Sequence, residues 1–292
     1  MNELAASYVE CQRVARRSAS SFYYSFLLLP KRKRRAMCVL YAFLRRTDDL
    51  GDNSDSVSER RAALQSWRHS LARAARGIYD DPLLPAVADV IEEFSVPPEY
   101  LTSVIDGVEM DLEPCRYETF EQLEKYCYRV ASVVGLACLR IWGCAHTDAQ
   151  RPARQCGLAF QMTNILRDLN EDVARDRIYF PQQDLDRFGY TADELRAGAG
   201  NDRFRELMRF EIERTEKFYA EAADLEQWLE PDGRRVFGSM MAVYRALLAE
   251  IKRLDGDVLS RRVRLSRWHK MRIATRWLLV RSAAATAGIH SP

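Results

Sequence analysis

The sequence predicts an all-α protein, and three observations support that prediction. Apolar residues recur at the three- and four-residue spacing of an amphipathic helix along almost the whole chain of 292 residues. No stretch of useful length alternates apolar and polar residues as a β-strand would. The 13 glycines and 10 prolines make up about 8% of the chain, against ~12% in an average protein, and so few breakers favour long helices.

The expected helices follow one another with prolines or polar loops between them. They span residues 3–17, 20–28, 31–52, 57–76, 83–94, 98–112, 119–145, 149–175, 202–229, 232–256 and 260–284. Prolines, which start or stop helices, fall between these segments: Pro30, Pro82, Pro97, Pro98, Pro114, Pro181 and Pro231. The clearest loops are 53–56 and 176–201. Because no internal repeat or low-complexity linker occurs, we expect one domain, residues 1–292, of ten or more helices.

Several classes of protein are excluded by composition. No run of 18 uncharged apolar residues exists that could span a membrane, and residues 1–17 lack the apolar stretch of a signal peptide. The seven cysteines contain no CxxC pair, so we expect buried thiols in a reducing cytoplasm and no cysteine metal site. The four histidines form no HExxH motif, and no GxGxxG motif follows a strand. Hydrolase, metalloprotease and Rossmann nicotinamide functions therefore have no support.

The net charge of +2 conceals two basic ends and an acidic middle. Residues 1–46 carry ten Lys or Arg and two Glu, and residues 261–292 carry eight Lys or Arg and no acid. Residues 47–260 therefore have a net charge of −14. This asymmetry indicates either solvated charge, or anion or membrane binding at the ends with cation binding in the middle.

Two acidic clusters carry the strongest chemical signal. Asp48 and Asp52 are four residues apart, so on a helix both carboxylates leave the same face. Asn164, Asp168 and Asp172 repeat that spacing within a segment rich in apolar residues. Like charges at this spacing repel each other unless a cation lies between them, and Mg²⁺ prefers carboxylate oxygens. Two facing acidic helices with Mg²⁺ between them would form a clamp for a diphosphate.

An arginine accompanies each acidic cluster. Arg45 precedes Asp48, and Arg167 precedes Asp168. A planar guanidinium can bind phosphate oxygens in pairs, or it can form a salt bridge with the neighbouring aspartates, and both roles can coexist.

The sequence resembles the squalene/phytoene synthase family, the head-to-head prenyl synthases. The first cluster resembles the DxxxD motif of that family, and the second resembles its NILRDxxED motif with a GRIYxP-type ending. The matching segments are 21–30, 41–52, 106–112, 126–135 and 161–181. The resemblance implies an isoprenoid-synthase fold, a single domain of helices around a central apolar cavity. It also implies that two allylic prenyl diphosphates are joined through a cyclopropylcarbinyl diphosphate.

By motif position, the resemblance implies a role for each candidate site residue. The expected Mg²⁺ ligands are Asp48, Asp52, Asp168 and Asp172. The expected catalytic residues are Phe22, Tyr41, Arg45 and Tyr126. The expected substrate-binding residues are Ser21, Arg45, Val134, Gly135, Gln161, Asn164, Arg167, Tyr244 and Arg262. Phe22 could equally serve core packing, and so could the small residues Val133, Val134, Gly135, Ala137 and Cys138, so both interpretations stay open.

The cofactors and partners follow from the same resemblance. We expect Mg²⁺ and prenyl diphosphate substrates, with NADPH only through a site unlike the Rossmann fold. The basic C-terminal segment could lie on an anionic membrane surface as an amphipathic helix or pack on the acidic middle of the domain. We therefore expect a cytoplasmic protein with peripheral contact at the inner face of the membrane. No nucleic-acid reader motif occurs.

Farnesyl diphosphate is the expected substrate, with presqualene diphosphate or squalene as the product. Phytoene synthase, which uses geranylgeranyl diphosphate, is the alternative. A class I terpene cyclase is a more distant one, because residues 48–52 satisfy DDxxD but the second cluster lacks the arrangement that such cyclases use. A non-enzymatic assembly factor is disfavoured because all four motif aspartates are present.

Overall fold

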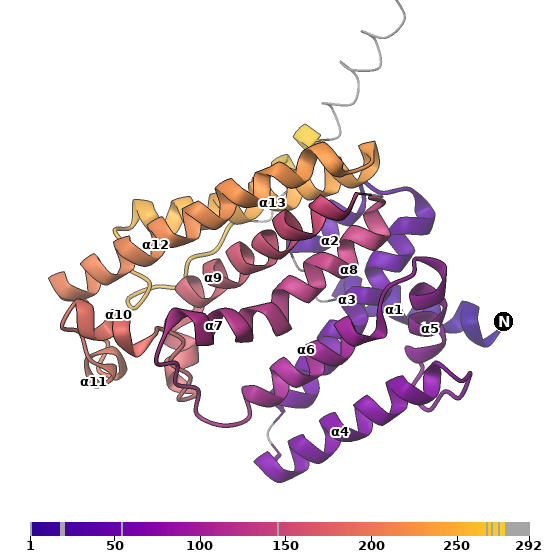
Figure 1. Cartoon of the computed structure of the whole chain (residues 1–292), viewed down its shortest axis with the longest axis horizontal. Helices are drawn as coiled ribbons and strands as arrows, with labels where there is room; N and C mark the ends of the chain where they lie inside the picture. The colour runs from indigo at the N-terminus through magenta and orange to yellow at the C-terminus, as the bar shows by residue number, and fades with distance from the viewer. Residues whose placement is uncertain are drawn as a thin grey trace, which may run out of the picture.

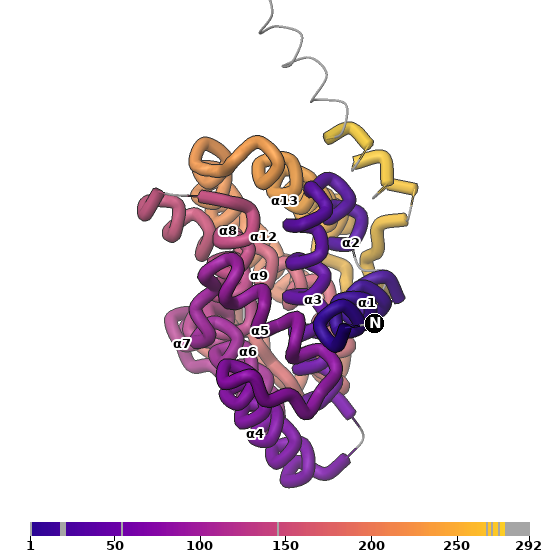
Figure 2. The backbone as a smooth tube through the Cα atoms, turned by 90° about the vertical axis from the view of Figure 1, so that its right-hand side faces the viewer, coloured from indigo at the N-terminus to yellow at the C-terminus, as the bar shows by residue number. Residues whose placement is uncertain are grey.

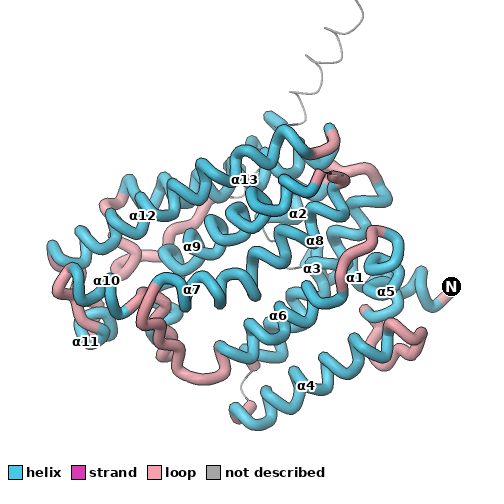
Figure 3. Tube along the Cα trace, in the orientation of Figure 1, coloured by secondary structure: helices cyan, strands magenta, loops and turns pink. Residues whose placement is uncertain are grey.

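The structure, a computed structural model, describes residues 2–17, 21–53, 55–144, 146–266, 268–269, 271–273 and 275–277. These residues form helices and loops without a strand (Figures 1 and 3). The α-helices are α1 (Glu3–Arg17), α2 (Ser21–Phe26), α3 (Lys31–Asp52), α4 (Val57–Ala74), α5 (Leu84–Glu93), α6 (Pro98–Met110), α7 (Phe120–Cys127), α8 (Val133–Trp142), α9 (Gln150–Ala174), α10 (Gln182–Arg187), α11 (Ala192–Arg196), α12 (Asp202–Ala223) and α13 (Pro231–Arg253). The all-α prediction is confirmed.

Most boundaries agree with the sequence prediction because local signals set them. Pro98 and Pro231 occupy the first turns of α6 and α13, where a missing N–H costs nothing. At the start of α4, the Ser56 side chain accepts a hydrogen bond from the Glu59 N–H, and the Glu59 carboxylate accepts one from the Ser56 N–H. This capping box satisfies two backbone donors that the helix start would otherwise leave unpaired.

Helix α9 is the centre of the bundle. It packs against α8, α12 and α13 and against the π-helical turn Tyr128–Ser132 (Figure 1). Apolar residues on its buried side, such as Met162, Ile165, Leu166 and Leu169, are almost completely inaccessible to solvent. This packing leaves the remaining face of α9 free to line a cavity.

The expected helix 119–145 is divided into α7, the π-helical turn and α8, which ends at Trp142 before Gly143 with φ +87°. Helix α9 approaches the turn closely at Gly157, where an added Cβ would lie 2.5 Å from the Ala131 carbonyl oxygen. Such turns are frequent at functional sites. Here Val130 and Ala131 of the turn line the cavity described below.

Two further predictions need correction. The expected loop 176–201 contains the short helices α10 and α11, the latter with its own capping box between Thr191 and Glu194. The expected helix 260–284 does not begin at 260, because residues 262–266 are not helical and the Val263 side chain is buried. Helical residues follow from Trp268, and the Trp277 ring fills the space beside Gly238 of α13. Figure 2 shows this C-terminal segment in yellow.

Candidate active site

A cavity of about 580 Å³ lies between α2, α3, α6, the π-helical turn, α8, α9 and α13. One face of α3 lines it over four turns, and its residues change from apolar to charged along the helix: Met37, Leu40, Tyr41, Leu44, Arg45, Asp48 and Asp52. Met37 precedes Asp48 by eleven residues, which corresponds to about 16 Å along the helix axis. Helix α9 shows the same change, from Ala153 and Cys156 to Asp168 and Asp172.

The polar ends of α3 and α9 meet. Asp52 at the end of α3 binds Arg175 at 2.9 Å and Arg177 at 3.1 Å, and both arginines directly follow α9. The cavity therefore has a charged end, where the two helices finish, and an apolar end, where they start. This is the geometry expected for a ligand with a charged head and a hydrocarbon tail.

In the first acidic pair, Asp48 and Asp52, only the Asp52 carboxylate is hydrogen-bonded within the described residues. Asp52 is held by the two arginines, whereas no hydrogen bond ties the Asp48 carboxylate to any other described residue. The Asp48 side chain is exposed to solvent, and it lines the cavity, so it lies in a cleft and not on an open surface. Burial in the cleft, reinforced by the neighbouring charge of Asp52, raises the pKa of Asp48 to about 7.

The second pair repeats this arrangement. Asp168 accepts hydrogen bonds from Arg167 Nε at 2.9 Å and from Arg262 Nη2 at 3.0 Å. The Asp172 carboxylate has no hydrogen-bond partner among the described residues, and burial together with the charge of Asp168 raises its pKa to about 7. One turn before Asp168, the Asn164 amide oxygen is buried without a hydrogen-bond donor.

These oxygens fit a hard cation. Unpartnered carboxylate and amide oxygens in a cleft are what Mg²⁺ binds. Its charge would offset both the burial and the carboxylate repulsion that raise the pKa of Asp48 and Asp172. No group of three or more His, Cys, Asp or Glu side chains that could hold a metal ion occurs among the described residues. A metal ion would therefore complete its coordination with water and with oxygens of the bound ligand.

The arginines expected to bind diphosphate all lie at the charged end. Arg45 lines the cavity and forms an ion pair with Asp49, and Arg167 lines it while paired with Asp168. Arg262 reaches Asp168 and Glu171 from the segment that follows α13. The salt-bridge role is thus present at each of them, and the guanidinium groups of Arg45 and Arg167 also line the cavity.

The aromatic residues expected near the reacting centre also meet at the cavity. Phe22 of α2 stacks on Tyr244 of α13 at 5.4 Å between ring centroids, and Tyr244 stacks on Phe160 at 4.1 Å. Tyr41 lies edge-on to Phe26 at 6.4 Å. These rings pack against one another and also form the cavity wall. Phe22 therefore serves core packing and lines the cavity at the same time.

Three further predicted positions can be located. Gln161 and Val134 line the cavity. Gly135 does so as well, and a Cβ there would lie 2.6 Å from the Ala153 carbonyl oxygen, so this glycine also permits close helix packing. Ser21 begins α2, but its side chain lies outside the described part of the chain.

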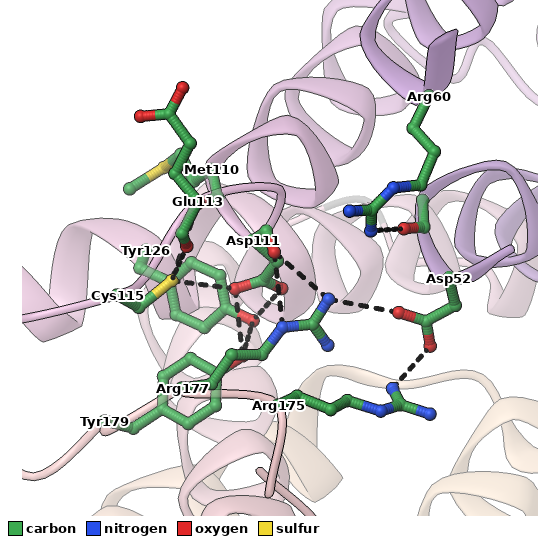
Figure 4. A network of polar contacts seen from close by, with 11 residues as sticks. Asp52, Arg60, Met110, Asp111, Glu113, Cys115, Tyr126, Arg175, Arg177 and Tyr179 are labelled. Carbon is green, nitrogen blue, oxygen red and sulfur yellow. Dashed lines mark hydrogen bonds and ion pairs between the residues drawn. The ribbon is translucent and has the colours of Figure 1, made fainter. Parts of the chain in front are cut away.

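The site contains a hydrogen-bond network around Asp111, of which only Tyr126 was an expected site residue. Asp111, at the end of α6, accepts hydrogen bonds from the Tyr126 hydroxyl at 2.7 Å and from the Tyr179 hydroxyl at 2.9 Å (Figure 4). Arg177 donates to the Asp111 carbonyl oxygen at 3.1 and 3.2 Å. Asp111, Arg177 and Tyr179 occur inside the motif segments 106–112 and 161–181, which was the one available signal.

Burial raises the pKa of the Asp111 carboxyl, opposed by the hydrogen bond from Tyr126 and the charge of Arg177. Burial, followed by the charge of Asp111, raises the pKa of Tyr126 well above its usual value, and the same causes act on Tyr179. Both phenols therefore stay protonated and act as donors. Burial also raises the pKa of the Cys115 thiol to about 12, so it remains a weak donor toward Asp111 at 3.4 Å.

Comparison with known proteins gives matches over nearly the whole chain. A family model described as squalene/phytoene synthase matches residues 15–269. The phytoene synthase of Arthrospira platensis is 37% identical over 278 residues, which cover 91% of this chain and 90% of that protein. The phytoene synthase of Mycobacterium tuberculosis is 34% identical over 296 residues, 100% of this chain and 96% of the relative.

Comparison with solved structures also gives squalene and dehydrosqualene synthases. Squalene synthase HpnC from Alicyclobacillus acidocaldarius superposes with a TM-score of 0.81 and 31% identity, covering 87% of this chain and 95% of that one. A dehydrosqualene synthase in complex with ligand superposes with a TM-score of 0.87 and 28% identity, covering 96% and 98%. The expected isoprenoid-synthase fold is therefore confirmed.

Proposed function

The chain belongs to the squalene/phytoene synthase family of prenyltransferases, and from that premise we propose that it condenses two farnesyl diphosphates head to head. The proposed product is presqualene diphosphate, or a squalene-type thirty-carbon product if that diphosphate ionises again. The observation that carries the proposal is the cavity, which joins acids and arginines at one end to an apolar wall over the rest.

Asp48, Asp52, Asp168 and Asp172 would hold Mg²⁺, with the Asn164 amide oxygen as a further ligand. Bound Mg²⁺ supplies Lewis-acid stabilisation of the negative charge on a departing diphosphate. The guanidinium groups of Arg45, Arg167 and Arg262 bind the diphosphate oxygens from the protein side, by exchanging their present carboxylate partners for phosphate.

The rest of the cavity protects the carbocation that remains after ionisation. Its apolar wall excludes water, which would otherwise convert the cation to an alcohol. The faces of Phe22, Tyr41 and Tyr126 favour a positive charge nearby by ~0.5–2 kcal/mol each. Diphosphate departure and cation rearrangement therefore take place in adjoining parts of one cavity, with Tyr126 where the two parts meet.

Two observations bear on substrate length. The superposition on solved squalene and dehydrosqualene synthases, at 31% and 28% identity, supports farnesyl diphosphate. Bulky side chains in the cavity wall, among them Phe26, Met37 and Trp142, also suit the shorter chain. The relatives named phytoene synthase support geranylgeranyl diphosphate and a forty-carbon product as the second candidate.

We also propose peripheral contact with an anionic membrane. Trp268 and Met271 are 77% and 40% exposed, in a segment that carries the basic residues Arg264, Arg272 and Arg276. Large exposed apolar side chains among cations are typical of segments that insert at a lipid interface. No helix in the described part of the chain is long and apolar enough to cross a membrane.

A product assay tests the proposal. Purified protein is incubated with Mg²⁺ and either farnesyl or geranylgeranyl diphosphate, with and without NADPH, and the products are dephosphorylated and extracted. We expect a thirty-carbon product from farnesyl diphosphate, and its dependence on NADPH shows where the reaction stops. A forty-carbon product would select the second candidate. Diphosphate release with only fifteen- or twenty-carbon products would contradict head-to-head condensation.

A further inference from the structure

We propose that Asp111 is a positioning residue for the condensation, which orients the hydroxyl groups of Tyr126 and Tyr179 so that both phenol oxygens act as acceptors toward the cavity. The inference rests on the proposed function, because it assigns Asp111 a part in stabilising the carbocation. It is carried by the contacts of the Asp111 carboxylate, each of whose oxygens has its own phenol donor.

The geometry leaves the two phenols little freedom. Their rings are stacked at 5.2 Å with an interplanar angle of 24°, and the side chains are only 3% and 4% exposed. At such buried positions polar groups are paired within the protein, and the Asp111 carboxylate is the charged acceptor for both hydroxyls. A phenol has a single proton to donate. The Tyr126 hydroxyl lies 2.7 Å from Asp111 Oδ2 and 3.2 Å from the Tyr179 oxygen, so its proton is directed mainly at the nearer, charged acceptor. The Tyr179 proton is directed at Asp111 Oδ1, and both phenols keep oxygen lone pairs for other neighbours.

Asp111 is itself fixed at the charged end of the cavity. Its carbonyl oxygen accepts two hydrogen bonds from Arg177, and the same guanidinium binds Asp52 at 3.1 Å. Asp111, Tyr126 and Tyr179 all line the cavity. The phenol oxygens are therefore held at a constant position relative to the carboxylates proposed to bind Mg²⁺ (Figure 4).

This arrangement has an electrostatic consequence. A hydrogen bond to an ionised acceptor increases the electron density on the donor oxygen, and the effect is stronger away from bulk water. Two such oxygens, oriented before the reaction, favour a cation that develops in the cavity without reorganisation at that moment. An asparagine at position 111 would donate from its amide group to one phenol and so reverse the orientation of that hydroxyl.

A double-mutant cycle tests the proposal with farnesyl diphosphate, Mg²⁺ and the full-length chain. The variants are Asp111→Asn, Tyr126→Phe and the combination. Asp106→Asn is the matched control, because Asp106 lies on α6 outside the cavity lining, where it pairs with Arg68. We expect Asp111→Asn to lower kcat by about 100-fold with KM changed less than about threefold. Because Asp111 acts through Tyr126, the combined variant should be no slower than the slower single variant.

The product distribution is the second readout. Loss of cation stabilisation should raise the ratio of fifteen-carbon alcohol to coupled product in Asp111→Asn, whereas Asp106→Asn should match the wild type. Multiplicative effects of Asp111→Asn and Tyr126→Phe on kcat, or an unchanged kcat in Asp111→Asn, would overturn the proposal. Absence of any coupled product from the wild type would instead contradict the proposed function itself.

Thermal melting identifies a variant that fails to fold. If Asp111→Asn shows no cooperative transition, Tyr126→Phe and Tyr179→Phe carry the test, because both keep the carboxylate and remove one phenol oxygen. The proposal then requires kcat to fall in both variants while each keeps a cooperative melting transition, and an unchanged kcat in either one overturns it.

Discussion

Arg262 lies 3.0 Å from Asp168, although 94 residues separate them in the chain. The contact brings the segment that follows α13 over the charged end of the cavity, where Arg262 also pairs with Glu171. Val263, the next residue, is buried. This part of the basic C-terminus therefore packs on the acidic middle of the domain, which was one of the two arrangements that the charge pattern allowed.

We predict that Arg262→Gln raises the KM for farnesyl diphosphate by about tenfold or more, because a charge-assisted contact with the diphosphate is lost. Arg264→Gln, two residues further along on an exposed side chain, should keep the wild-type KM. Steady-state kinetics of both variants measure the difference. Equal KM values in the two variants would show that Arg262 serves only as a partner for Asp168.

Local spacing made the acidic pairs predictable, because carboxylates four residues apart on a helix must share a face wherever that helix packs. Asp111 and Tyr179 had no such signal. They meet because two non-helical segments run side by side, with hydrogen bonds from Ile178 N–H to the Cys115 carbonyl and from Gln182 N–H to the Tyr117 carbonyl. A contact between loops depends on the path of the whole chain, so the spacing of apolar and polar residues does not predict it.

The predicted start of the C-terminal helix at residue 260 was wrong for a related reason. Helical spacing of apolar residues from 260 onward favoured a helix, but the local preference is overridden at 262–266. There the pairing of Arg262 with Asp168 and the burial of Val263 hold the chain in a non-helical path. Helix propensity contributes less than about 1 kcal/mol per residue, so tertiary contacts of this kind decide the outcome.

The carboxylates of the two pairs should be indispensable for turnover. We predict that Asp48→Asn and Asp168→Asn each lower kcat by at least about 100-fold while far-UV circular dichroism stays unchanged. Asp49→Asn is the matched control, because Asp49 is exposed and pairs with Arg45. Its activity should stay within about threefold of the wild type. A large loss in Asp49→Asn would favour the DDxxD interpretation and hence the terpene cyclase.

The raised pKa values of Asp48 and Asp172 predict how Mg²⁺ binding depends on pH. Both values lie at about 7, above the ordinary value of a carboxyl group, so the metal-free folded protein binds more protons than the unfolded chain. These groups therefore lower stability as pH rises from about 4 to 7. Mg²⁺ binds the ionised form, so below pH 7 it must displace protons.

Thermal melting measures this linkage. The increase in melting temperature caused by Mg²⁺ should be larger near pH ~8 than near pH ~5.5, and Asp48→Asn should diminish that difference. An increase of the same size at both pH values would show that neither carboxylate titrates on metal binding.

Close approach of α9 to the π-helical turn predicts a stability effect. A Cβ at Gly157 would meet backbone atoms of Ala131 and Ser132 at 2.5–2.7 Å, and backbone cannot rotate away as a side chain does. We expect Gly157→Ala to lower the free energy of unfolding by about 1–3 kcal/mol in urea denaturation. Gly200→Ala is the control and should not destabilise the protein, because an added Cβ there would lie more than 4 Å from every atom beyond the adjacent residues.

Membrane contact through the exposed apolar residues of the C-terminal segment can be tested without removing that segment. Truncation would also remove Trp277 from its contact with Gly238, so point variants are more informative. We predict that Trp268→Ser with Met271→Ser reduces co-sedimentation with phosphatidylserine vesicles by about tenfold, because two inserted apolar side chains contribute the binding free energy. Ile78→Ser is the control, since Ile78 is 46% exposed on the connection between α4 and α5. Retained binding in the double variant, or equal losses in both proteins, would contradict insertion by this segment.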